Sequence, residues 1–115
     1  MTQNSDSPAV TGNQLLAILA ALASPPRLRI IAALTANGRN YVSQLAREVD
    51  ISRPLLHLHL QKLEAAGLVT SMLELSDDGK ALNYFEVSDF NLSLNARAVH
   101  AATATLTATS TKPDL

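Results

Sequence analysis

The stretch at positions 41–69, YVSQLAREVDISRPLLHLHLQKLEAAGLV, decides the fold of this 115-residue chain. Its first part repeats apolar residues at helical spacing, which predicts a short helix with Ser43 as its cap. Ser52 follows a break in that pattern and can cap a second helix, with Pro54 in the first turn, where a missing N–H costs nothing. Gly67 is a typical C-terminal stop. The pattern therefore predicts two helices joined by a tight turn.

The predicted second helix, residues 53–66, has two different faces. At about 100° per residue, one side carries Leu56, Leu60 and Leu63, which we expect to be buried, with Leu55 and His59 beside them. The opposite side is largely polar, and the second helix of a helix-turn-helix unit presents such a side to the major groove of DNA. We therefore predict that this region binds DNA through Ser52, Arg53, Pro54, His57, Leu58, Gln61 and Lys62. Leu58 is either an ordinary exposed leucine or a contact to thymine methyl groups.

Composition excludes several classes of site. The absence of cysteine removes disulfides and thiolate metal sites, and two Phe, two Tyr and no Trp cannot build a base-stacking platform. The net charge is −1, yet positions 25–62 hold six basic residues against two acidic ones, which suits phosphate contacts. The apolar run at 15–23 is far shorter than the roughly 20 residues of a membrane span. We expect a cytoplasmic protein with no membrane partner.

The remaining chain predicts a mainly α fold with a small β-hairpin. In order, we expect helices over 13–23 and 25–37, an extended link at 39–42, the helix-turn-helix, strands over 68–75 and 82–87, and a helix over 90–106. Ser24 should cap the second of these helices, and Ser88 or Asp89 the last. Leu28, Ile31 and Leu34 should face the core, with Ile30 beside them. Residues 1–12 and 110–115 should be loose tails around one domain, residues 13–109.

The segment 25–87 resembles the winged-helix repressors of the ArsR (arsenic-repressor-like) family. The residues that carry the resemblance are SPPRLRII at 24–31, VSQLA at 42–46, SRP at 52–54, HLQKLEAAGLV at 59–69, GK at 79–80 and NYF at 83–85. Where that family usually has a small polar residue and a Gln or Arg, this chain has His57 and Leu58. The hairpin is then a wing with its tip at 76–81. We expect Lys80 and Arg27 to contact phosphate, whereas Asp77 and Asp78 would be repelled by it.

The resemblance implies that the first and last helices form a two-fold dimer interface. Both carry apolar stripes with no other evident partner, and the expected interface residues are Leu15, Leu16, Leu19, Leu22, Phe90, Leu94, Val99 and Leu106. The alternative is that the two helices pack only on each other within one chain.

Metal sensing and catalysis are not expected. Related metal sensors use cysteines in the first helix of the DNA-binding unit, or Asp and His pairs on the last helix. Here positions 42–46 hold no thiol, Asn91 follows Asp89 where a histidine would be needed, and His100 stands alone. His59 is expected to be a satisfied core histidine, and His57 to face DNA. We find no catalytic residues, no phosphate loop and no cofactor motif.

The sequence therefore predicts a transcriptional regulator, a homodimeric repressor that binds a palindromic operator in double-stranded DNA through helix 53–66 and wing 76–81. The alternative is a winged-helix module for protein–protein interaction, in which Leu55 and Leu58 extend an apolar patch. No small-molecule effector can be identified from the sequence. The sequence still allows an apolar molecule to bind at the dimer interface.

Overall fold

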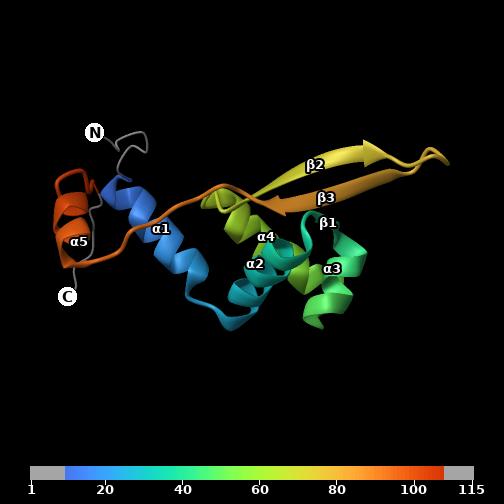
Figure 1. Ribbon diagram of the computed structural model, residues 1–115, viewed down its shortest axis with the longest axis horizontal. Coiled ribbons are helices and arrows are strands. Elements are labelled where there is room, and N and C mark those ends of the chain that lie inside the picture. The colour runs from blue at the N-terminus through green and yellow to red at the C-terminus, as the bar shows by residue number, and fades with distance from the viewer. Residues whose placement is uncertain (1–9, 108–115) are drawn as a thin grey trace. The chain divides into compact units, whose positions relative to one another are not determined.

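The computed structural model describes residues 10–107, so the predicted tail at 110–115 and most of the predicted tail at 1–12 lie outside the described range, while Gly12 already belongs to a helix. Within that range the helices and strands follow in the order α1 (Gly12–Leu22), α2 (Pro25–Asn37), β1 (Asn40–Tyr41), α3 (Val42–Val49), α4 (Arg53–Ala65), β2 (Val69–Leu75), β3 (Ala81–Val87) and α5 (Ala96–Thr103) (Figure 1). They form two compact units. The larger unit is Ile18–Phe90, and the smaller unit joins the chain up to Ala17 with the chain from Asn91.

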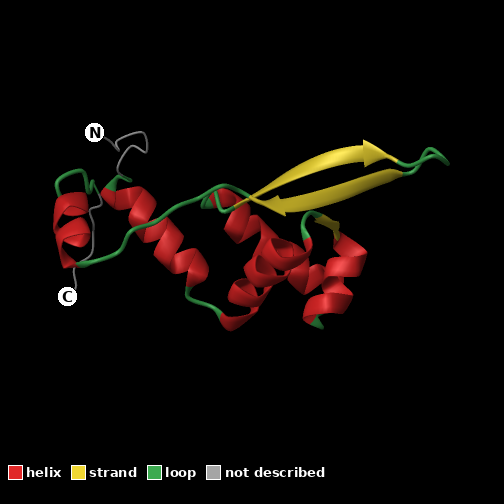
Figure 2. Ribbon diagram, in the orientation of Figure 1, coloured by secondary structure: helices red, strands yellow, loops and turns green. Residues whose placement is uncertain are grey.

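The larger unit is a winged helix-turn-helix, which confirms the predicted fold class. Helices and one antiparallel sheet of strand order β1-β3-β2 build it (Figure 2). Its fully buried side chains come from α2, α3, α4 and the chain that enters β2, and they are Ile30, Leu34, Leu45, Leu56, Leu60, Leu63, Leu68 and Val69. The predicted buried row of α4 is therefore confirmed. Burying a leucine or isoleucine contributes about 1.5–3 kcal/mol relative to its exposure, so this cluster holds the helices together.

Helix α2 begins and ends as its sequence predicts, but its buried side is rotated. The Ser24 hydroxyl accepts a hydrogen bond from the Arg27 N–H at 3.4 Å, and Gly38, with φ of 80°, ends the helix. Ile30 is fully buried, whereas Leu28 is 52% exposed. The expected core position of Leu28 is therefore wrong. The apolar residues at 28, 30 and 31 permit more than one helical phase, and packing against the rest of the unit selects the one that buries Ile30.

Helix α3 does not use the predicted cap. Ser43 lies inside the helix, which begins at Val42, and Tyr41 at the cap position makes no side-chain capping bond. The physical reason is that β1 leads directly into α3, and pairing of Asn40 and Tyr41 with β3 already fixes the backbone there. After α3, Asp50 adopts a left-handed conformation with φ of 59° and ψ of 51°, which turns the chain into α4.

The wing is the β2–β3 hairpin, the long ribbon in Figure 1. Its register runs from Val69 opposite Val87 to Leu75 opposite Ala81. The turn beyond is closed by a hydrogen bond from the Ser76 N–H to the Lys80 carbonyl at 2.8 Å. This arrangement confirms the hairpin that the sequence predicts, and β1 adds a short third strand to β3.

The smaller unit contains a shorter last helix than predicted. Helix α5 begins at Ala96, because the Asn95 side chain accepts a hydrogen bond from the Ala98 N–H at 2.7 Å and caps it there. The helix expected over 90–106 is therefore wrong at both ends, and neither Ser88 nor Asp89 caps it. Residues 91–95, NLSLN, do not join the helix, and Asn and Ser favour caps and turns over helix interiors.

The start of α1 packs closely on residues 102–106 within the smaller unit. The Gly12 N–H donates to the Thr105 hydroxyl at 2.8 Å. A side-chain carbon at position 12 would lie 2.5 Å from the Ala102 carbonyl oxygen, so only glycine fits there without a shift. The two terminal segments therefore do contact each other within one chain.

Candidate nucleic-acid interface

The outer side of α4 is open to solvent over the length of the helix. Ser52 caps it by accepting a hydrogen bond from the Leu55 N–H at 3.3 Å, which sets Arg53 at the first helical position. Leu58 is 57% exposed, whereas Leu60 is only 1% exposed. The other predicted contacts of this region are exposed too, namely Ser52, Arg53, Pro54, His57, Gln61 and Lys62. The structure thus brings together, on α4 and its cap, the contacts predicted for this region, whereas Arg27 and Lys80, also predicted to contact DNA, lie on α2 and at the wing.

The last turn of α3 adds a basic side chain, Arg47, to which the sequence alone assigns no role. Arg47 and Arg53 line one hollow of about 290 Å³ together with Ser43. Arg29 lines a second hollow of about 360 Å³, beside Asp50 and Ile51. Arg47 counts toward the basic stretch at 25–62, but its position next to Arg53 depends on the angle of the turn, which the sequence alone does not give. The signal that could have identified it is a basic residue on the polar side of the first helix.

Arg27 is half-buried, and its guanidinium binds neighbouring elements of the protein. Its Nε donates to the Ala21 carbonyl at 2.6 Å and its Nη2 to the Ala20 carbonyl at 3.5 Å, near the end of α1. Its Nη1 lies 3.1 Å from Nδ1 of His59. Because a guanidinium can only donate, this contact requires His59 Nδ1 to accept and its proton to sit on Nε2. Arg27 therefore links α1, α2 and the rear of α4.

The electrostatics of His59 agree with that link. Partial burial, and then the positive charges of Arg27 and Lys62, lower the pKa of His59 below its usual 6.5. The neutral ring is the form that can accept from Arg27, so the favoured charge state and the hydrogen bond support each other. His59 thus has the hydrogen-bond partner expected of a satisfied histidine, but it is half-buried and does not belong to the core.

The tip of the wing has mixed charge. Lys80 is exposed, and its N–H donates to the Asp78 carboxylate at 3.4 Å. The Ser76 hydroxyl also donates to Asp78. These hydrogen bonds, first that of Ser76 and then that of the Lys80 backbone, lower the pKa of Asp78. Asp78 thus keeps its charge, and Lys80 with Asp77 and Asp78 leaves the tip with little net attraction for phosphate.

Two further features bear on the class of site. Among residues 10–107, no three His, Asp or Glu side chains gather closely enough to hold a metal ion. In the same range no single helix is long and apolar enough to cross a membrane, and only α1 and α2 taken as one bent pair reach that length.

Comparisons with known proteins agree with this geometry. A family described as a helix-turn-helix domain matches residues 22–71. An uncharacterized HTH-type transcriptional regulator of Methanocaldococcus jannaschii is 35% identical over 75 residues, which cover 65% of this chain and 77% of that protein.

Solved structures share the fold. A crystal structure of an ArsR family transcriptional regulator superposes with a TM-score of 0.57 at 24% identity, covering 84% of this chain and 87% of that one. The transcriptional repressor BigR from Xylella fastidiosa gives a TM-score of 0.56 at 22% identity, with 80% and 79% covered. The sequence relative and the fold together show that α4 and the wing belong to a protein that regulates transcription by binding DNA. Such a regulator is not an enzyme. The chain belongs to the helix-turn-helix transcriptional regulators and carries the winged-helix fold of the ArsR-type members.

Proposed function

We propose that this regulator is a homodimeric repressor that lays one α4 from each copy into successive major grooves of a palindromic operator. The observation that carries the proposal is the division of α4 into a leucine row with at most 1% exposure and an opposite side that is open and polar. Helix-turn-helix dimers place such helices about one DNA turn apart. A regulator of this kind works where the chromosome lies, in the cytoplasm of a bacterium or an archaeon.

The residues of the interface divide by their chemistry. Arg53, His57 and Gln61 can donate to base edges, and Leu58 offers an apolar surface to thymine methyl groups. The residues suited to phosphate contacts, which fix the position of the protein on DNA, are Ser52, Lys62, Lys80 and, from the last turn of α3, Arg47. Arg27, also predicted to contact phosphate, uses its donors on α1 and His59. We propose that Arg27 supports α4 from behind.

Arg53 gives the most direct test of this arrangement. It opens α4 and lines the hollow at the turn, so it should meet DNA before any other side chain of the helix. We expect Arg53→Ala to weaken binding to the operator by about 1–3 kcal/mol. Arg97→Ala, which removes the same charge from the exposed side of α5, is the matched control and should bind as wild type. Equal affinity of Arg53→Ala and wild type would show that Arg53 does not contact DNA at the start of α4.

The dimer is proposed to form through the smaller unit. Leu16 on α1 and Val99 on α5 are 53% and 43% exposed, and Leu94 and Leu106 of the same unit are also open. Such a cluster of exposed apolar residues is expected at a subunit interface. Of the other predicted interface residues, Leu15 is buried at 6%, and Leu19, Leu22 and Phe90 belong to the larger unit.

The oligomeric state decides this part of the proposal. Equilibrium sedimentation at micromolar concentration should give the mass of a dimer for wild type. Leu16→Asp should give a monomer, because a charge would be buried without a partner. Ala17→Asp, at an exposed position beside it, controls for the added charge and should change the association less. A wild-type protein that remains strictly monomeric would remove the dimer and the palindromic operator together.

A further inference from the structure

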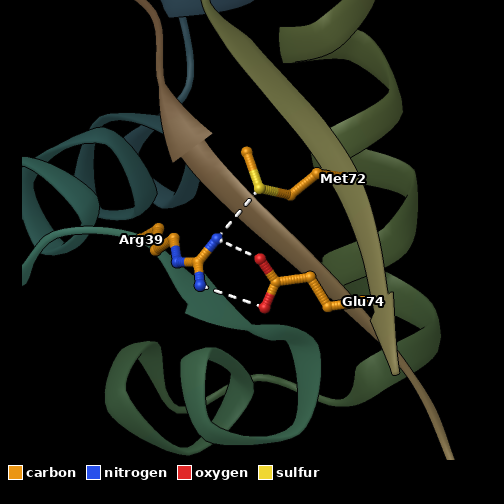
Figure 3. A network of polar contacts seen from close by, with 3 residues as sticks. All are labelled: Arg39, Met72 and Glu74. Carbon is orange, nitrogen blue, oxygen red and sulfur yellow. Dashed lines mark hydrogen bonds and ion pairs between the residues drawn. The ribbon is translucent and has the colours of Figure 1, made fainter. Parts of the chain in front are cut away.

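A single arginine reaches across the sheet face at the wing. Arg39 precedes β1, and its guanidinium forms a bidentate ion pair with Glu74 on β2, with Nη1–Oε2 at 2.7 Å and Nη2–Oε1 at 3.0 Å (Figure 3). Nη1 also lies 2.9 Å from the sulfur of Met72. The Glu74 carboxylate, first through its hydrogen bond, raises the pKa of Arg39 above its already high value.

Strand β3 also contacts Arg39, through an aromatic ring. The Arg39 guanidinium lies over the ring of Tyr84 on β3, 4.5 Å from its centre. Tyr41 on β1 meets the same ring edge-on, with the ring centres 5.8 Å apart. Contacts of these kinds are individually weak on an exposed surface, but they act here on one guanidinium whose planar fork is already oriented. Arg39 therefore contacts β2 and β3 at once, and the chain runs from it directly into β1.

The position of Glu74 explains what such a contact can do. Glu74 pairs with Leu82, and beyond it only the Leu75–Ala81 pair separates it from the turn that carries Lys80. At the other end of the contact, β1 runs directly into α3. The Arg39–Glu74 pair thus joins the outer part of the wing to the start of the helix-turn-helix.

We propose that Arg39 and Glu74 are positioning residues that hold the wing at a fixed place relative to the helix-turn-helix, and that Arg39 is not itself a phosphate contact. Both terminal nitrogens of Arg39 are already bound to Glu74, so a phosphate would have to displace a bidentate carboxylate. The effect of this pair on DNA binding rests on the proposed function, in which Lys80 is the contact that the wing brings to DNA.

The first experiment measures the wing without DNA. Because the chain has no cysteine, Ala36→Cys at an exposed position of α2 and Asp77→Cys at the wing tip give a unique pair of sites for spin labels. Both lie in the larger unit. Mixed with an excess of unlabelled protein, so that in the proposed dimer only the two labels of one copy are measured, the otherwise wild-type pair should show one narrow distance distribution. Arg39→Met and Glu74→Gln should broaden it, whereas Glu86→Gln, which removes the same charge from β3, should not. A distribution for Glu74→Gln as narrow as that of wild type would overturn the proposal.

The second experiment uses the sign of a charge effect on DNA affinity. By electrostatics alone, Glu74→Gln should bind DNA more tightly, because it removes a negative charge and frees Arg39. The proposal predicts the opposite: weaker binding for Glu74→Gln, with an unchanged or slightly higher affinity for Glu86→Gln. Tighter binding of Glu74→Gln would overturn the proposal, and a gain larger than that of Glu86→Gln would identify Arg39 as a phosphate contact.

Combination with Lys80 separates this inference from the proposed function. Lys80→Ala should lower the slope of log affinity against log salt by about one. Arg39→Met/Lys80→Ala should then lose no more affinity than Lys80→Ala alone, because both changes act on the same contact. Additive losses would contradict positioning through Lys80. If Lys80→Ala binds as wild type, the wing contact of the proposed function fails, and the spin-label distances still decide whether the Arg39–Glu74 pair holds the wing.

Discussion

Leu58 and Leu60 are neighbours in α4, and identical truncations at the two positions should have opposite consequences. Leu60 is 1% exposed and belongs to the fully buried cluster, whereas Leu58 is 57% exposed on the outer side. Deleting a buried leucine to alanine costs about 2–5 kcal/mol, from the lost apolar contact and the cavity that remains. We therefore expect Leu60→Ala to lose that amount of unfolding free energy, and Leu58→Ala to change it by no more than about 0.5 kcal/mol.

Urea unfolding followed by circular dichroism measures the stability of both variants, at one protein concentration because a dimer would make the midpoint concentration-dependent. The DNA affinity of both variants is measured next. Leu60→Ala should keep its affinity in the temperature range where it is folded, whereas Leu58→Ala should keep its stability and lose affinity if it meets thymine methyl groups. Equal destabilisation by the two truncations would refute the assignment of the two faces of α4.

Three further predictions concern the cap of α4, the packing of the smaller unit and the charge of His59. Ser52→Ala removes the hydroxyl that caps α4 and should cost about 1 kcal/mol in urea unfolding, while Ser52→Asp, which can still cap, should cost less. Gly12→Ala would place a carbon 2.5 Å from the Ala102 carbonyl oxygen, so we expect a lower melting temperature by calorimetry; an unchanged value would show that this packing is loose. Since the folded state lowers the pKa of His59 below 6.5, the unfolded chain binds the proton first. Unfolding free energy should therefore fall as the pH drops below about 6.5, and His59→Gln should weaken that dependence, which urea titrations at several pH values would reveal.

The helix-turn-helix could be predicted because its local signals agree with one another. Ser52, Pro54 and Gly67 mark the ends of α4, and the leucine spacing identifies its buried row without any knowledge of the partner elements. The wing followed from a Gly-containing turn between two apolar segments. Capping residues, turn residues and leucine spacing act through neighbours in the chain. The folded structure therefore keeps the helix ends and faces that they predict.

The sequence predictions are wrong at positions whose structure depends on tertiary contacts. Leu28 and Ile30 are both apolar on one helix, and only packing in the folded unit settles which is buried. Arg27 has the same composition signal as Arg47, yet its guanidinium turns toward α1 and His59. The apolar stripe over 90–106 predicts a longer last helix than α5, because the stripe does not show that Asn95 caps the helix and begins it later. Ion pairing between Arg39 and Glu74, 35 positions apart, leaves no pattern in the sequence.

The most direct test of the whole account is an NMR titration of the labelled protein with a short DNA duplex, recording which amide signals shift. We predict shifts at Arg53, His57, Gln61 and Lys62 on α4, at Arg47 by the turn and at Lys80 in the wing, with Leu16 and Val99 unaffected. Shifts confined to the smaller unit, with α4 unchanged at saturating DNA, would contradict the claim that the outer side of α4 is the surface that reads DNA.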